Sequence, residues 1–273
     1  MDNWPDCREF EKRYENVEVC RDCGLGRTTS ALTPDDAQDY ITSTTSHPDP
    51  VERRRYFQRL YRKYLRQTPR GRSLDVGCGP GQFVEVLLDA GWDAFGLDAY
   101  REARVNHRFI RGTMKSLEAG AAYDLISMVH TLEHIVNPAE ALRRVSTMLR
   151  PGGIFLVVVP NFAGDWSVSC GDKWPMLDTR NHAFHYTSTA LRKLLENGDF
   201  VVRKSDTYSG YAASMRERRF GENGFYQKGW GSVQPFRSLV FRANAALRPI
   251  LNGYLDMTKR GAEIIMLATR ISP

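Results

Sequence analysis

The sequence predicts an α/β fold, and residues 73–98 carry most of that prediction. A short apolar run, Leu74–Val76, indicates a buried strand, and a glycine-rich turn follows it at 77–81. Apolar residues at helical spacing over 83–88 and a second apolar run at 94–97 complete a strand–turn–helix–strand unit. The chain has 273 residues, of which 42% are hydrophobic, so it is long enough for one such domain with additions.

The composition narrows the class of protein. The formal net charge is +6, but the basic clusters at 53–55, 143–144 and 216–219 are scattered and lack interleaved aromatics, so a nucleic-acid partner is not expected. No apolar run of roughly eighteen residues occurs, so no membrane span is predicted. The charged N-terminus and an odd count of 5 cysteines predict neither secretion nor a disulfide framework. A cytoplasmic location is expected, and the oligomeric state stays open.

The glycine-rich turn has the chemistry of a nucleoside site. Gly77, Gly79 and Gly81 follow a G-x-G-x-G spacing, which lets the backbone approach a ligand where a Cβ would collide. Asp98 ends the second strand, where a carboxylate is placed to take the two hydroxyls of a ribose. A dinucleotide site would need G-x-G-x-x-G, and Asp75 would repel a phosphate but suits a cation. The pattern therefore favours a nucleoside cofactor that carries positive charge.

Several motifs in order resemble a known family. The segment LDVGCGPG at 74–81 resembles the first motif of class I methyltransferases, and Asp98 resembles their ribose-binding acid. Residues 132–161 read LEHI, then a helix, then LRPGG and a strand ending in Pro-Asn, which resembles the second half of the same core. The resemblance therefore covers residues 73–161, about one third of the chain.

This resemblance implies a Rossmann-like methyltransferase fold, which is a doubly wound, mostly parallel seven-stranded sheet with an antiparallel last strand. It also implies S-adenosylmethionine as cofactor, a molecule that has no phosphate and carries an ammonium and a sulfonium. The adenine is expected near the third strand, at Thr113 or the Met114 backbone. The cofactor-binding residues it implies are Asp75, Gly77, Gly79, Gly81, Gln82, Asp98, Ala99, Thr113, Met114 and His130.

The whole chain divides into four parts in this interpretation: an N-terminal element at 1–50, the core at 51–206, a lid insertion at 207–260 and a final core strand at 261–273. Beyond the central unit, helices are expected over 50–67, from 138, after an N-cap at Thr187 or Ser188, and over 238–251. Further strands are expected over 108–111, 123–129, 154–159, 200–204 and 262–270. A polar linker over 42–49 and a short helix after Asp98 are also expected. The aromatic residues assigned to the lid are Tyr208, Tyr211, Phe225, Tyr226 and Trp230.

The N-terminal element is expected to be one alternating strand, from Tyr14, that runs into Cys20-x-x-Cys23-Gly-Leu. That ending has the form of a zinc knuckle, and it resembles the zinc-ribbon-like segment of many small-molecule methyltransferases. A full zinc site needs four ligands, but only Cys7 lies upstream, and Trp4 stands where its partner would be. We therefore expect a degenerate ribbon without metal, with bound zinc as the alternative.

Histidine is the natural base for methyl transfer to a hydroxyl near pH 7. In the motif order, His182 and His185 follow the fifth strand, at the sheet edge where α/β proteins bind ligands, and they are the preferred candidates. His134 is the next candidate, whereas His130 is expected to offer its backbone to the cofactor. Each histidine alone also fits a hydrogen-bonded structural role.

The run His130-x-x-Glu133-His134 spells an inverted zinc-protease signature, but that signature needs a helix and here it follows a strand, so a protease is rejected. Some O-methyltransferases for catechol-like or RNA-terminal hydroxyls bind a divalent ion through E-x-x-E-H at this place. His130 replaces the first acid of that motif, and Mg²⁺ prefers oxygen ligands. No metal is expected in the catalytic site, and an ion near Glu133 and His134 stays an open alternative.

Together these features predict an S-adenosylmethionine-dependent methyltransferase that acts on a small molecule, at oxygen, with a histidine base. A sugar, a polyketide or another secondary metabolite would suit the aromatic lid. The alternatives are an RNA or protein methyltransferase, suggested by the basic charge, and a non-catalytic cofactor-binding module. A steep loss of affinity with salt would mark a polyanionic partner.

Overall fold

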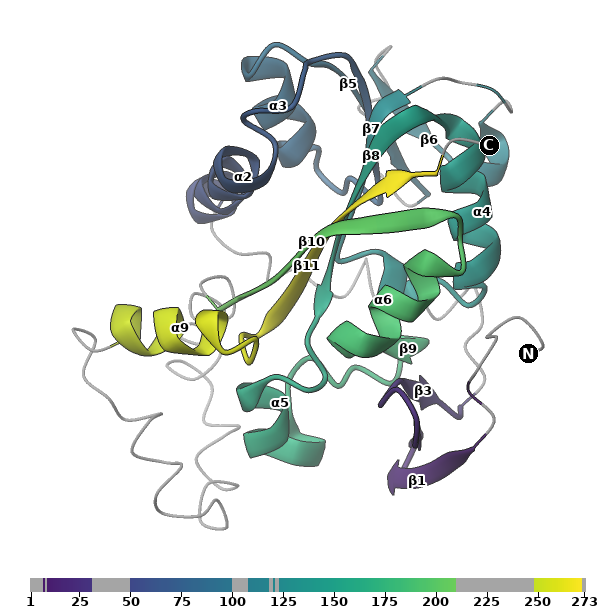
Figure 1. Ribbon diagram of the computed structural model, residues 1–273, viewed down its shortest axis with the longest axis vertical. Coiled ribbons are helices and arrows are strands. Elements are labelled where there is room, and N and C mark those ends of the chain that lie inside the picture. The colour runs from purple at the N-terminus through teal and green to yellow at the C-terminus, as the bar shows by residue number, and fades with distance from the viewer. Residues whose placement is uncertain are drawn as a thin grey trace.

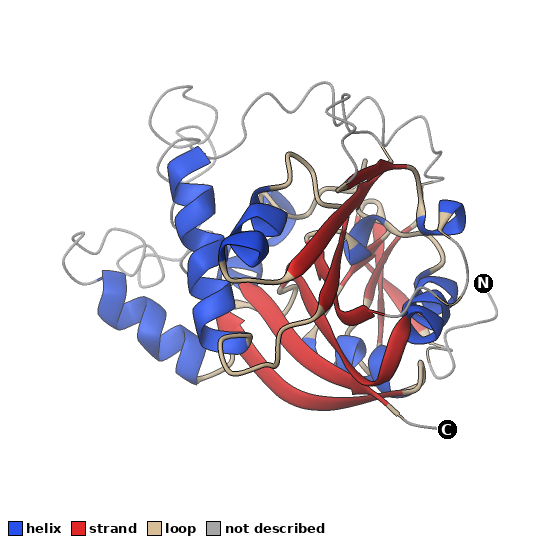
Figure 2. Ribbon diagram, turned by 90° about the horizontal axis from the view of Figure 1, so that it is seen from above, coloured by secondary structure: helices blue, strands red, loops and turns tan. Residues whose placement is uncertain are grey.

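The computed structural model describes residues 7, 9–30, 50–99, 108–117, 120, 123–209 and 248–271, which form two β-sheets and the helices around them (Figures 1 and 2). The larger sheet has seven strands in the order β10-β11-β8-β7-β4-β5-β6. Among the described residues, no helix is long and apolar enough to cross a membrane.

Five strands of the larger sheet are parallel, and their pairing runs from β8 through β7, β4 and β5 to β6. The strand β11 is antiparallel to both of its neighbours, β8 and β10, which confirms the predicted α/β sheet with an antiparallel last strand. The bounds are β4 Arg72–Val76, β5 Asp93–Asp98, β6 Phe109–Arg111, β7 Tyr123–Val129, β8 Leu149–Pro160, β10 Phe200–Tyr208 and β11 Glu263–Arg270.

Helices cover both faces of this sheet, with α2 and α3 on one side and α4 and α6 on the other (Figure 1). Strand β8 shows why, because its side chains alternate between the two faces. Phe155, Val157 and Val159 pack in the core beneath α4 and α6, whereas Leu156 and Val158 pack beneath α2 and α3. Such strands are apolar on both faces, as buried parallel strands are. The bounds are α2 Pro50–Tyr64, α3 Gln82–Asp89, α4 Pro138–Met148, α5 Asp165–Cys170, α6 Ser188–Glu196 and α9 Arg248–Met257.

The helix starts follow from local chemistry. Asn137 caps α4 by accepting the Glu140 amide at 3.2 Å, and Pro138 takes the first helical position, where no amide hydrogen is needed. Thr187 caps α6, as predicted, by accepting the Ala190 amide at 3.1 Å. Short 3₁₀ turns, η1 Met114–Ser116, η2 Leu132–His134 and η3 Gly171–Lys173, lie in the connections.

The smaller sheet has the order β1-β2-β3-β9 and differs from the single strand expected in the N-terminal element. The bounds are β1 Phe10–Tyr14, β2 Val17–Cys20, β3 Gly26–Thr28 and β9 Phe184–His185. The strand expected from Tyr14 is present as β2, and a two-residue turn at 15–16 pairs it with β1, so that Tyr14 lies opposite Val17. Its fourth strand comes from the segment before α6, because Gly26 pairs with His185. The Thr187 hydroxyl donates to the Cys23 carbonyl at 2.6 Å, which ties this sheet to the start of α6.

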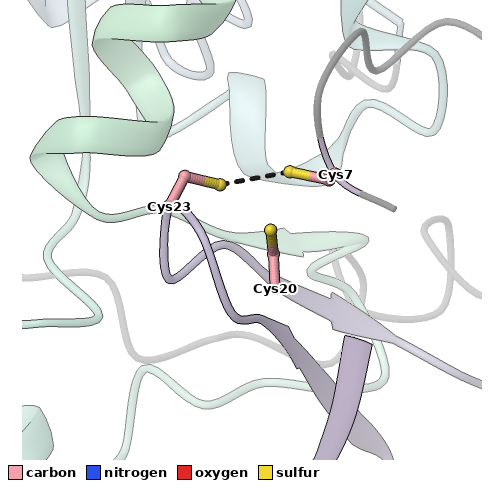
Figure 3. A group of neighbouring side chains, drawn as sticks. All are labelled: Cys7, Cys20 and Cys23. Atoms are coloured by element: carbon pink, nitrogen blue, oxygen red, sulfur yellow. Dashed lines mark hydrogen bonds between the residues drawn. The ribbon is translucent and has the colours of Figure 1, made fainter. Parts of the chain in front are cut away.

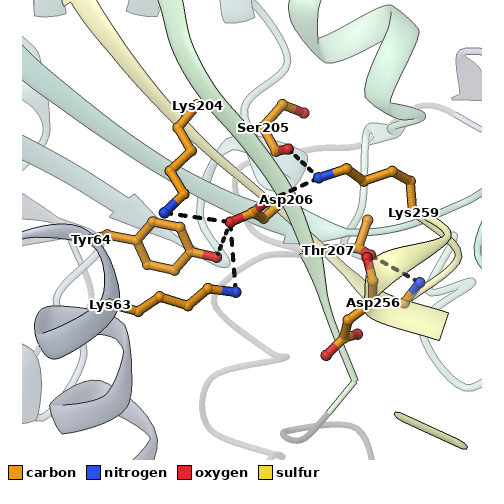
Figure 4. A network of polar contacts seen from close by, with 9 residues as sticks. Lys63, Tyr64, Lys204, Ser205, Asp206, Thr207, Asp256 and Lys259 are labelled. Atoms are coloured by element: carbon orange, nitrogen blue, oxygen red, sulfur yellow. Dashed lines mark hydrogen bonds and ion pairs between the residues drawn. The ribbon is translucent and has the colours of Figure 1, made fainter. Parts of the chain in front are cut away.

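A network around Asp206 joins α2, β10 and Lys259, which follows α9 (Figure 4). The Tyr64 hydroxyl donates to Asp206 at 3.0 Å and Lys259 donates at 2.9 Å, with Lys63 and Lys204 at 3.5 Å and 3.8 Å. Partial burial raises the pKa of this carboxyl, but Lys259, Tyr64 and Lys63 outweigh burial and hold the pKa below its usual value. Asp206 therefore fixes α2 against the outer strand of the sheet.

Several predicted boundaries shift. Helix α2 ends at Tyr64, three residues before its predicted end, and β8 begins at Leu149, five residues before its predicted start. Strand β10 continues to Tyr208, four residues beyond the predicted end, because it pairs with β11 along its whole length. The expected helix over 238–251 is described only from Arg248, and it ends at Met257. The rest of that helix, the lid over 210–247 with Tyr211, Phe225, Tyr226 and Trp230, the linker at 42–49 and the stretch at 100–107 lie outside the described residues.

The turn after β4 has no space for a side chain at Gly77. Gly77 and Gly152 share a φ of +73°, but a Cβ on Gly77 would lie 2.2 Å from the Thr131 hydroxyl, whereas nothing lies within 4 Å at Gly152. The Thr131 hydroxyl donates to the Val76 carbonyl, so it is not free to move. Gly152→Ala is expected to cost about 1 kcal/mol of unfolding free energy from backbone strain, and Gly77→Ala about 1–3 kcal/mol more. Urea denaturation of both variants measures the difference, and equal losses would show that Thr131 yields without cost.

Candidate active site

The glycine turn stands at the carboxyl end of β4 and is held by β5. Gly77, Gly79 and Gly81 have φ values of +73°, +49° and +87°, a backbone region in which a Cβ is strained. The Gly77 amide donates to the Leu97 carbonyl at 2.8 Å, so the turn begins beside the last residues of β5. Gly81 then begins α3. The predicted strand–turn–helix geometry is therefore present.

Asp98 and Asp75, the two acids of the motif, occupy different environments. The half-buried Asp98 carboxylate accepts the Gly79 amide at 2.8 Å, so it lies directly against the turn. Asp75 is buried within β4 and accepts the Ser127 hydroxyl of β7 at 2.7 Å. Burial raises the pKa of Asp75 to about 7, although Ser127 and Arg53 lower it in part. Asp98 thus contacts the turn directly, whereas Asp75 lies in β4, just before the turn, and contacts the neighbouring strand β7.

Four further predicted cofactor residues lie in the segments that follow β4, β5 and β6. The Thr113 side chain is exposed and caps η1, where it accepts the Lys115 amide at 3.3 Å. The Met114 carbonyl accepts Arg144 at 2.9 Å. The Gln82 amide reaches the Pro50 carbonyl of α2 at 3.4 Å. Ala99, which follows β5, is half-buried.

His130 has a larger part than its predicted backbone role. Its φ is +55°, and its ring lies between two buried carboxylates, with Glu133 3.4 Å from Nδ1 and Glu263 3.1 Å from Nε2. The Tyr56 hydroxyl of α2 donates to the other oxygen of Glu263 at 3.2 Å. Burial lowers the pKa of His130, but both carboxylates outweigh it and raise the pKa to about 10. His130 is therefore an imidazolium at neutral pH.

Sequence reasoning missed Glu263, which lies 133 residues beyond His130. It reaches the site because β11 pairs with β8 so that Glu263 lies opposite Pro160 at the same sheet edge. The only sequence signal was an acid at the start of an otherwise apolar strand, AEIIMLATR, where a buried charge requires a partner.

The three candidate bases gather in one cluster. The ring of His182 lies 4.7 Å from that of His134 and 5.9 Å from that of His185, measured between centroids. Burial, with the neighbouring His134 and His185, holds the pKa of His182 well below its usual value, and burial lowers the pKa of His185 to about 4. His182 and His185 are therefore neutral near pH 7. His185 also belongs to β9, so the smaller sheet forms one side of the cluster.

Hydrogen bonds fix how these rings are protonated. Nδ1 of His134 lies 3.0 Å from the Asn181 carbonyl, and Nδ1 of His182 lies 3.1 Å from the Met176 carbonyl. A carbonyl only accepts, so both Nδ1 atoms carry the hydrogen. Nε2 of His185 lies 3.3 Å from the Thr28 hydroxyl, which already donates to the His182 carbonyl, so Nε2 carries the hydrogen there. In the neutral form of each ring, the lone pair is therefore on Nε2 in His134 and His182 and on Nδ1 in His185.

Three cysteines meet beside the smaller sheet (Figure 3). Sγ of Cys7 lies 3.1 Å from Sγ of Cys23, and Cys20 completes a group whose sulfur atoms lie within 4.8 Å of one another. A closed structural zinc site has four ligands. In the described ranges no fourth cysteine, histidine or acid joins this group, so the residues fit three of the four positions. Burial, followed by the other two cysteines, raises the pKa of the Cys7 thiol.

Comparison with known proteins supports the same class. A family model described as "Methyltransferase domain" matches residues 51–205. A protein of Mycolicibacterium smegmatis named "Probable S-adenosylmethionine-dependent methyltransferase" is 29% identical over 66% of this chain and 73% of its own length. A ubiquinone biosynthesis O-methyltransferase of Aeromonas salmonicida is 32% identical over 56% of this chain and 71% of its own. Other matches with that name cover only about 38% to 43% of the relative's length.

Among solved structures, the Burkholderia thailandensis 1,6-didemethyltoxoflavin-N1-methyltransferase, crystallised with 1,6-didemethyltoxoflavin and S-adenosylhomocysteine, matches with a TM-score of 0.55 and 14% identity over 97% of this chain and all of its own. At that identity the likeness shows the fold alone. The family match spans more than half of the chain, and it agrees with the glycine turn and the acid at the end of β5. The chain belongs to the methyltransferase domain family.

Proposed function

We propose that this methyltransferase transfers the methyl group of S-adenosylmethionine to a hydroxyl oxygen of a small molecule, such as a sugar, a polyketide or another secondary metabolite. The observation that carries the proposal is the cluster of half-buried His134 with buried His182 and His185, at the edge of the fold that also holds the glycine turn. The name of the Aeromonas relative, an O-methyltransferase, agrees with oxygen as the acceptor atom.

The cofactor is S-adenosylmethionine, and the contacts around the turn suggest how it is held. Asp98 takes the ribose hydroxyls, because its carboxylate lies directly against the turn at the carboxyl end of β5. Gly77, Gly79 and Gly81 line the methionine part, where the backbone can approach closely. Asp75 supplies negative charge beneath the turn for the ammonium. Gln82, Ala99, Thr113, Met114 and His130 complete the proposed set.

The chemistry at the acceptor requires little beyond alignment and proton removal. The acceptor oxygen forms a bond to the methyl carbon while the carbon–sulfur bond breaks and its electron pair stays on sulfur. The hydroxyl proton passes to an imidazole nitrogen that carries a lone pair. Burial keeps His182 and His185 neutral, which is the form that accepts a proton.

The ribose contact can be tested with a matched pair of acids on one strand. Asp98→Ala is expected to weaken S-adenosylhomocysteine binding about 100-fold, because two hydrogen bonds to a charged group are lost. Asp93→Ala, at the opposite end of β5 with an exposed ion pair to Arg108, is expected to leave the affinity unchanged. Calorimetry measures both. Unchanged binding in Asp98→Ala, or micromolar binding of NAD, would contradict the assignment.

The base can be tested by mutation. His182→Ala or His185→Ala is expected to lower turnover about 100-fold or more, which is the usual contribution of a general base. Cofactor affinity should stay nearly unchanged, because neither residue lies on the glycine turn or β5. The readout is kcat with the true acceptor beside calorimetry with S-adenosylhomocysteine. Full turnover in both variants would leave His134 as the candidate base, or would indicate an acceptor that needs no base.

The pH dependence follows from the neutral form being the active one. With a base of pKa about 4, as for His185, about 90% of the molecules keep it deprotonated at pH 5. A base with the usual pKa of about 6.5 would keep about 3% at the same pH. We therefore expect kcat to stay nearly level from pH 7 to 5, measured at saturating cofactor because Asp75, with a pKa of about 7, gains a proton over this range. A fall centred near pH 6.5 would rule out His185 as the base.

A further inference from the structure

Glu133, His134 and His182 form a convergent set of donor groups that methyl transfer alone does not explain. The first two lie in η2 after β7, and the third lies in the segment that precedes β9. Their ligand atoms all lie within 4.8 Å of one another. The Ala183 amide donates to the Glu133 carbonyl at 2.8 Å, so the two segments are fixed side by side.

The two histidines are oriented as metal ligands are. Each donates its Nδ1 hydrogen to a backbone carbonyl, of Asn181 and Met176 respectively, which directs the Nε2 lone pairs of the two rings. A backbone carbonyl on the far nitrogen is the usual partner of a metal-binding histidine, because it fixes both the tautomer and the ring orientation. His185 has the opposite tautomer and stands outside the set.

The Glu133 carboxylate supplies a second, independent observation. It is 1% exposed, and neither of its oxygens has a hydrogen-bond partner. Nδ1 of His130 lies 3.4 Å from a single one of these oxygens, and Glu263 contacts the other nitrogen of the same ring. A buried carboxylate whose oxygens accept no hydrogen bond is costly in the interior. A bound cation beside Glu133 would offset that cost.

We propose that Glu133, His134 and His182 bind one divalent transition-metal ion of the zinc type. Two imidazole nitrogens and one carboxylate form the ligand set of many catalytic zinc sites, in which a fourth position stays open. Mg²⁺ would prefer an all-oxygen set. Ligands of one tetrahedral zinc lie about 3.3 Å apart, so ligand atoms that now lie within 4.8 Å of one another need to approach by up to about 1.5 Å. The sequence motif contains only two of these ligands, and the third comes from the fold.

Metal binding by these residues does not depend on the proposed function, but its role does. A metal at this place would supply a Lewis acid that lowers the pKa of an acceptor hydroxyl at the open position. The lone pairs of His134 and His182 would then be taken by the ion. His185, with its lone pair on Nδ1, is left as the histidine that accepts the hydroxyl proton.

Cobalt(II) tests the site, because its visible spectrum reports the ligand set. The full chain is stripped with a chelator and titrated with Co²⁺ in the absence of cofactor and acceptor. We expect one equivalent with visible bands typical of nitrogen and oxygen ligands. His182→Gln and Glu133→Gln should each weaken this binding more than 100-fold, since even the outer partners of metal ligands contribute 10- to 100-fold. His185→Gln, in the same cluster but outside the ligand set, should bind like the wild type.

The three clustered cysteines are the internal control. Any Co²⁺ held by Cys7, Cys20 and Cys23 would show a thiolate charge-transfer band in the near ultraviolet, which a Cys20→Ser/Cys23→Ser variant removes. Thermal melting of the metal-free variants identifies any that fail to fold, and the wild-type titration decides alone in that case. Absence of the nitrogen–oxygen spectrum in the wild type, or equal loss in His185→Gln and His182→Gln, would overturn the proposal. A protein that binds the metal but methylates nitrogen would refute the proposed function and leave the metal site standing.

Discussion

The position of β4 between β5 and β7 is the constraint on which the rest of the structure depends. Parallel pairing places Val76 beside Leu97 on one side and Met128 on the other, so three strands end at one level. The chain must leave each strand there, which brings the glycine turn, Asp98 and His130 together. Open α/β sheets bind ligands at this edge because their connecting loops gather there. The register of these strands therefore determines which side chains meet at the site.

What could be predicted from the sequence was what local chemistry decides. The apolar run at 123–129 became β7 with those bounds, and Thr187 capped α6, because burial and capping act over a few residues. The glycine turn and the acid at the end of β5 were found for the same reason. The lid and the domain boundaries remain predictions.

The parts that could not be predicted depend on contacts between distant segments. Glu263 meets His130 only because β11 pairs with β8 in one register, and nothing near either residue signals the other. The third donor beside Glu133 and His134 comes from a loop 48 residues after His134, fixed by one backbone hydrogen bond. The strand expected from Tyr14 is present as β2, but its hairpin partner β1 and the turn at 15–16 were not predicted, because alternation alone does not show where a hairpin folds back.

Strand β9 comes from the core but pairs with the N-terminal element, and this limits which substitutions the N-terminal element can accept. The first thirty residues look like an addition to a complete core, yet their sheet is closed by Phe184 and His185, which belong to the segment between β8 and α6. Gly26 packs closely against this segment, since a Cβ there would lie 3.0 Å from that of His185, and His185 would have to shift by a few tenths of an ångström. A substitution in the N-terminal element can therefore move His185, one of the candidate bases. Exchange of this element between relatives would also exchange the strand that pairs with the segment carrying this histidine.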